Sequence, residues 1–391
     1  MKRTTIVILS LSLLLVFILQ TLGFSLTAPK PLWRDELNTQ TYTLNESYAD
    51  ILLGKSEMEG NRAPFFYLQQ KIFCAIFHFQ TPQPWLEGHW EHVDPFANIF
   101  LRILPVFWMS AFFLLVFLYF SLRFNIFLGL LGLLAGLTSL SLWLYWAEAR
   151  PYGLWVLLTG LQMILFLEIL HEKTASYKKW LCLSFVNIFL SLTCVLSFLQ
   201  IGIVCAMLLF KERRWHQYIL PLAIPMLFIY YYRPHAPSND IIFIMTVPQL
   251  FFSTLPSNQL FVFLFYPLLI GASYLQRKKI LLKTFHNDDI IAAFPFFLSI
   301  LLLIIATVLF LAQLQSHATG KGQYIVPRHI IFLVPVIIIG ITYLAGLLWQ
   351  NLKSYFWIKL LALIVIAGLL LFHINTVWGK IHYILTTNPY S

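Results

Sequence analysis

Charged side chains are scarce in this sequence. Asp, Glu, Lys and Arg make up 11% of the 391 residues, and 59% of the residues are hydrophobic. The mean hydropathy is +0.78. Soluble domains carry roughly 25% charged and about 45–50% apolar residues, so the composition argues against a soluble protein and predicts an integral membrane protein. The net charge of +10 then indicates cytoplasmic loops that follow the positive-inside rule rather than nucleic-acid binding.

Cysteine, sequence repeats and glycine-rich phosphate loops are rare or missing. The four cysteines lie in apolar runs, and no pair has the CxxC spacing of a metal site, so we interpret them as small hydrophobic side chains and not as a disulfide framework. The lack of an internal repeat is unlike many transporters. The sequence also has no low-complexity tract and no glycine-rich phosphate loop.

Long apolar runs dominate the chain instead, and a spanning helix needs about 20 such residues. One run, Trp180–Phe210, is too long for a single upright helix and is predicted to break near Ser191–Phe198. We therefore expect an all-α polytopic membrane protein with about eleven transmembrane helices. The expected spans are Ile6–Leu26, Ile99–Phe120, Ile126–Tyr145, Tyr152–Leu170, two within Trp180–Phe210, Ile219–Tyr232, Leu260–Leu275, Ile290–Ala312, Ile330–Leu348 and Trp357–Ile374.

The loops between these runs predict one membrane domain over residues 1–391 with a cytoplasmic N-terminus. Basic clusters such as HEKTASYKKW, KERRWH and QRKKILLK fall on the same side as Lys2 and Arg3. The opposite side receives the large first loop, residues 27–98, which holds nine of the sixteen acidic residues. Within it, Ala63–Phe79 is predicted to be an amphipathic helix in the membrane interface. We expect no soluble C-terminal domain.

The acid pair Asp35–Glu36 is the first candidate site, because it follows the first apolar run by only about ten residues. One interpretation is a solvated loop, where acids carry no cost. The other is a partly desolvated position beside Trp33, at which a carboxylate is tuned as a general base.

Cations stand at the outer mouths of later spans. Arg102, Arg150, Arg328 and His329 are candidates for holding a lipid phosphate, since a guanidinium suits a phosphate. Two alternatives stay open: Arg150 pairs with Glu148 to cap a short turn, and the pair Arg328–His329 snorkels at the interface. A base near phosphate-binding cations at a lipid boundary predicts group transfer from a lipid phosphate.

A divalent metal is the one cofactor that we consider. His89, His92 and Asp94 in EGHWEHVD are possible ligands, although their spacing matches no established metal motif. The sequence leaves metal dependence open, and no other cofactor is expected.

These stretches occur in an order that resembles the GT-C membrane glycosyltransferases, in the group of protein O-mannosyltransferases, aminoarabinose transferases and RgtA/B/C/D-like enzymes. The resemblance covers the whole chain as a pattern of spans and is most specific at DE and EARPY. The segments that carry it are the DE pair, RAPFFY, RILP, EARPY and RHIIFLVP.

The resemblance implies a GT-C fold and transfer of a sugar from a polyprenyl-phosphate donor to a lipid, glycan or protein acceptor, with inversion, on the outer face of a plasma membrane. Asp35 matches the catalytic Asp of the family and Glu36 its neighbour. Arg150 and Tyr152 match the turn near the donor, and Arg328 the position near the lipid phosphate. The segment RAPFFY, with the residues Arg62, Pro64 and Tyr67, is expected to form a substrate loop.

Two other classes stay open. A transporter or flippase for a lipid-linked substrate would also have about eleven spans, but its ionisable residues should lie near the membrane midplane. A non-catalytic scaffold subunit of the cell envelope would function without Asp35.

Overall fold

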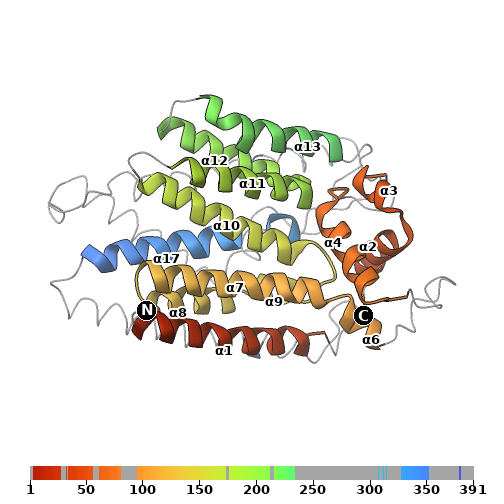
Figure 1. The fold of residues 1–391 in the computed structure, drawn as a ribbon, viewed down its shortest axis with the longest axis horizontal. Helices are drawn as coiled ribbons and strands as arrows, with labels where there is room; N and C mark the ends of the chain where they lie inside the picture. The colour runs from red at the N-terminus through yellow and green to blue at the C-terminus, as the bar shows by residue number, and fades with distance from the viewer. Residues whose placement is uncertain are drawn as a thin grey trace.

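The described part of the chain is helical. The computed structural model describes residues 3–27, 32, 34–55, 61–80, 95–172, 176–211, 215–233, 307, 311, 314, 327–351 and 378–379, and none of these forms a strand. The long helices lie side by side as a bundle, and a group of short helices sits at one end of it (Figure 1).

In the described part of the chain, eight helices form the bundle, several of them predicted. They are α1 (Arg3–Ser25), α7 (Ile103–Arg123), α8 (Ile126–Leu137), α10 (Tyr152–His171), α11 (Tyr177–Thr193), α12 (Phe198–Lys211), α13 (Ile224–Tyr232) and α17 (Leu333–Asn351). A short helix, α9 (Leu140–Trp146), follows α8. The end module consists of α2 (Arg34–Asn45), α3 (Tyr48–Leu52), α4 (Phe65–Ile76) and α6 (Pro95–Phe100). The 3₁₀ turn η4 (Pro327–Ile330) precedes α17.

Three described segments are long and apolar enough to cross a membrane: Thr5–Ser25, Phe96–Arg123 and Tyr152–His171. A bent pair would make a fourth. The fold is thus consistent with an all-α membrane protein, and the described residues contain three or four spans of full length where the sequence predicted about eleven. Three predicted spans lie wholly or almost wholly outside the described residues: Leu260–Leu275, Ile290–Ala312 and Trp357–Ile374.

The predicted break in the run Trp180–Phe210 is confirmed. Helix α11 ends at Thr193, a 3₁₀ turn covers Val195–Ser197, and α12 begins at Phe198. Each of the two helices is shorter than a full span.

The predicted span Ile126–Tyr145 is not one continuous helix. Helices α8 and α9 form an angle of 72° there. Around the bend, Thr138 donates its hydroxyl to the carbonyl oxygen of Ala135 at 2.9 Å, and the Trp143 indole donates to the Leu137 carbonyl at 2.7 Å. These two side chains supply donors that a straight helix would have taken from its own backbone.

The run Ile219–Tyr232 also departs from a regular helix. It begins as a π-helical turn, Ile219–Ala223, before α13. Pro225 has no N–H group, so the carbonyl oxygen of Pro221 lacks its usual helical donor. Asn187 of α11 donates to that oxygen at 2.7 Å and also accepts a hydrogen bond from Gln162 of α10 at 2.8 Å. Fully buried amides therefore bind three segments together, as polar residues do between membrane helices.

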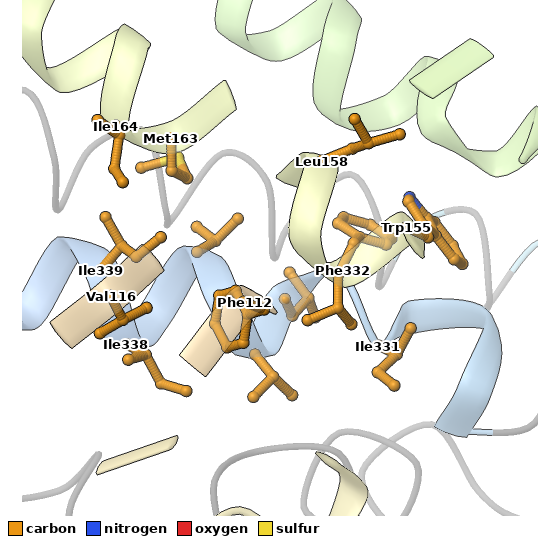
Figure 2. Packing of buried hydrophobic residues seen from close by; sticks show 14 of the residues in the cluster. Phe112, Val116, Trp155, Leu158, Met163, Ile164, Ile331, Phe332, Ile338 and Ile339 are labelled. Atoms are coloured by element: carbon orange, nitrogen blue, oxygen red, sulfur yellow. The ribbon is translucent and has the colours of Figure 1, made fainter. Parts of the chain in front are cut away.

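The apolar core lies where α7 packs against α10 and α17. Figure 2 shows Phe112 and Val116 between the two neighbouring helices, facing Ile338 and Ile339. Phe332, at the start of α17, packs on Trp155 with ring centroids 5.4 Å apart. This contact places η4 and the start of α17 beside the first turns of α10.

Candidate functional site

The acid pair does not lie in an irregular loop. Asp35 and Glu36 occupy the first turn of α2, which the sequence reading missed. Two acidic residues in the first turn stabilise a helix, because their negative charge faces the positive end of the helix macrodipole. No glycine or proline interrupts the next nine residues. The signal for this helix was therefore present in the sequence.

Glu36 is fully buried and its carboxylate binds two elements of the bundle. One guanidinium, that of Arg102 at the junction of α6 and α7, donates to both carboxylate oxygens, at 3.0 Å from Nε and 2.6 Å from Nη2. The backbone N–H of Ala149, in the turn between α9 and α10, donates to Oε1 at 2.6 Å. Glu36 thus fixes α2 to both the span start and the turn.

Arg102 is 2% exposed, and Nη1 also donates to the carbonyl oxygen of Thr27 at 3.4 Å. It was predicted to bind a lipid phosphate. In the structure its guanidinium faces Glu36 and the end of α1, so it connects three chain segments inside the protein.

Arg150 lies on the other side of the same turn and reaches α2. Its Nη1 donates to the backbone carbonyl oxygen of Asp35 and to the hydroxyl of Thr39, both at 2.8 Å. Gln40 completes the contact by donating to the carbonyl oxygen of Ala149 at 2.9 Å. The contact of α2 with this turn and with the start of α7 thus brings the acid pair close to Arg102 and Arg150.

Tyr152 is buried at the start of α10, and its ring centroid lies 5.8 Å from the Arg150 guanidinium carbon. Arg328 and His329 fall in η4, which packs against α9. Since Phe332 packs on Trp155, η4 lies at the same end of the bundle as Arg150 (Figure 1). The side chain of His329 is half-buried.

The predicted interfacial helix Ala63–Phe79 is α4, which spans Phe65–Ile76 with Pro64 at its N-cap. Its position in a membrane interface stays a prediction. Tyr67 is fully buried and its hydroxyl donates to the carbonyl oxygen of Asn61 at 2.9 Å. Arg62 is half-buried beside Asn61.

Helix α4 also holds the far end of α2. Lys71 donates to the carbonyl oxygens of Thr43 and Leu44 at 3.2 and 3.0 Å, and burial lowers the pKa of its ammonium group. A cation at the last carbonyls of a helix is stabilising. Sequence reasoning missed this residue; its charge on an otherwise apolar helix was the available signal.

The possible metal ligands His89, His92 and Asp94 lie outside the described residues. In the described part of the chain no group of three or more His, Cys, Asp or Glu side chains is arranged to hold a metal ion. All four cysteines are free thiols, in agreement with the prediction that they form no disulfide framework; three are buried and Cys182 is exposed.

Comparison with known proteins gives no relative: no family model, no curated protein and no solved structure matches the chain.

Proposed function

We propose that the protein is an inverting glycosyltransferase that moves a sugar from a polyprenyl-phosphate donor to an acceptor on the outer face of a membrane. The observation that carries this proposal is the contact between α2 and the turn before α10. It sets the partly exposed Asp35 beside Arg150, at the end of a bundle of apolar helices. An acidic residue beside an arginine, at the end of a bundle of apolar helices, suits group transfer from a lipid phosphate.

The two acids receive different roles. Glu36 has no exposed surface and already accepts hydrogen bonds from Arg102 and Ala149. It is a positioning residue that holds α2 in place. Asp35 is only half-buried and so more accessible than Glu36, and we assign its carboxylate to the acceptor.

In the proposed reaction, the acceptor hydroxyl loses its proton to the Asp35 carboxylate as its oxygen attacks the anomeric carbon. The new carbon–oxygen bond forms while the bond from that carbon to the phosphate oxygen breaks. The lipid phosphate leaves with the bonding electrons, and a single displacement inverts the anomeric configuration. A positioned general base contributes about 10²–10⁴-fold to such a step.

The donor phosphate is assigned to Arg150, whose guanidinium lies over the Tyr152 ring, and to Arg328 and His329, which belong to η4. Positive charge stabilises the leaving phosphate as its negative charge grows. Arg102 is not assigned to the donor, because Glu36 occupies its guanidinium. Arg62, Pro64 and Tyr67 are assigned to a loop that borders the acceptor. Metal dependence is left to the experiment.

The test is sugar transfer by purified protein in lipid, from a labelled polyprenyl-phosphate sugar, with and without chelator. Asp35→Asn is expected to reduce the rate constant by about 10²–10⁴-fold, because the amide accepts no proton. Asp50→Asn is the matched control, since Asp50 lies on α3 in the same module and binds Lys55 at 2.8 Å. It should transfer at the wild-type rate.

Near-normal transfer by the Asp35→Asn protein would overturn the assignment of the base. If the wild-type protein transfers no label but moves the labelled lipid between leaflets, the protein is a flippase. If it does neither, the scaffold class is favoured.

A further inference from the structure

Asn61 bridges the break between α11 and α12 from outside the bundle. Its amide nitrogen donates to the carbonyl oxygen of Thr193 at 2.8 Å, and its amide oxygen accepts from the N–H of Val195 at 3.4 Å. The helical donor for Thr193 would be Ser197, but the Ser197 N–H donates to the Cys194 carbonyl at 3.0 Å instead. One side chain of the first loop thus satisfies both a donor and an acceptor that the break leaves open.

The same residue is bound to the end module. The hydroxyl of Tyr67 donates to the backbone carbonyl oxygen of Asn61 at 2.9 Å. The Tyr67 ring packs edge-on against Tyr42 of α2, with ring centroids 5.0 Å apart. Phe65 stacks on Phe189 of α11 at 4.6 Å. A continuous path of contacts therefore runs from the helix break through Asn61 to the helix that carries Asp35.

The break is also connected to the cationic side of the site. In α12, Gln200 accepts a hydrogen bond from the Trp155 indole at 3.3 Å, and Trp155 lies in the first turns of α10, just after Arg150. The position of α12 relative to the turn is thus set on one side by Trp155 and on the other by Asn61.

We propose that Asn61 is a positioning residue, which fixes α2 and its Asp35 relative to Arg150 by joining the first loop to the α11–α12 break. The link to transfer rests on the proposed function; the joining of loop and break does not. The hydrogen bonds of Asn61 go to Thr193, Val195 and Tyr67, so we assign its effect on Asp35 to a path through Tyr67 and the break.

The experiment has two readouts on the same purified protein in lipid. The first is tryptic cleavage after Arg62, divided by cleavage after the exposed Lys55, which serves as an internal control. The second is transfer from the labelled donor, separated into kcat and the KM for the donor. Asn45→Ala is the matched control variant, because Asn45 is exposed at the end of α2.

For Asn61→Ala we expect the cleavage ratio to rise at least tenfold and kcat to fall at least tenfold, with the donor KM within threefold of wild type. The KM is spared because no donor-binding residue is changed. Asn61→Asp has the same shape but no N–H for Thr193, so it should behave like Asn61→Ala and serves if the alanine protein does not fold. Asn45→Ala should match wild type.

An unchanged cleavage ratio in both Asn61 variants would overturn the proposal. So would a raised ratio with wild-type kcat, because the loop would then be held without positioning the base. A wild-type protein that transfers no sugar would instead refute the proposed function, and the cleavage ratio would still decide whether Asn61 joins the loop to the break.

Discussion

At the scale of single residues, the acid pair separates into two environments because α2 is a helix. Consecutive residues of an α-helix point about 100° apart, so Glu36 turns into the protein while Asp35 stays half-exposed. The buried member then needs a counter-charge, since an isolated buried carboxylate is costly. Arg102 supplies this charge with two hydrogen bonds.

Breaking this buried pair should be costly on either side. Glu36→Leu or Arg102→Leu alone leaves one uncompensated buried charge and should lower the free energy of unfolding by about 3–5 kcal/mol. The double variant should lose less than the sum, because no charge is stranded. Chemical unfolding in detergent measures all three, with Lys55→Met of the exposed pair as a control that should match wild type. Additive losses would contradict the pairing.

At the scale of the elements, α8 packs closely on α7 through a face of small residues. A Cβ atom built on Gly129 would lie 2.6 Å from the backbone carbonyl oxygen of Phe117, and one on Gly132 would lie 2.8 Å from Val116. Small residues at a membrane helix interface allow this approach. After the bend, α9 leads into the turn that contains Arg150.

Gly129→Ala should therefore destabilise the bundle by about 1–3 kcal/mol, since backbone cannot give way as a flexible side chain would. Gly202→Ala on α12 is the matched control: among the described residues, its Cβ would meet Met226 alone, at 3.8 Å. That change should be neutral or slightly stabilising, because alanine is the better helix former. Thermal unfolding in detergent gives both values, and equal melting of the two variants would refute the close packing.

At the scale of the whole molecule, the two ends of the bundle carry separate polar clusters. Far from α2, Glu168 accepts from Tyr119 at 2.5 Å and pairs with Arg123 at 3.2 Å and Lys179 at 3.0 Å. These contacts join α7, α10 and α11 at the end where α7 finishes. The site residues lie at the opposite end, where α7 starts (Figure 1).

A substitution in the Glu168 cluster should therefore affect stability and spare the proposed activity, and a substitution of Asp35 at the other end should affect the activity and spare stability. Glu168→Gln removes the common partner of two cations and should lower the free energy of unfolding by about 1–3 kcal/mol, with transfer by the folded protein unchanged. Asp35→Asn should leave the free energy of unfolding unchanged and lower the rate of transfer. Parallel measurements of unfolding and of transfer on both variants test this; a loss of transfer in Glu168→Gln protein that remains folded would contradict it.

Much of the bundle followed from the sequence alone. Hydropathy decided that the chain is a helical membrane-type protein, and it placed α1, α10 and the break between α11 and α12, because long apolar runs have few other solutions in lipid. The sequence also showed an acid pair just after the first span and arginines at the ends of later spans. Their positions indicated that these residues would lie close together in one site. These features depend on local composition, which a sequence displays directly.

Only the tertiary structure decided how those residues share the site. Composition and spacing do not show which of Asp35 and Glu36, or of Arg102 and Arg150, is buried. Their burial and their partners depend on segments up to 115 residues apart. The hydrogen bond from Asn61 to Thr193 likewise joins distant segments, 132 residues apart. Such contacts leave no periodic pattern along the chain, because a hydrogen bond between two elements is set by how they pack and not by the spacing of residues within either one.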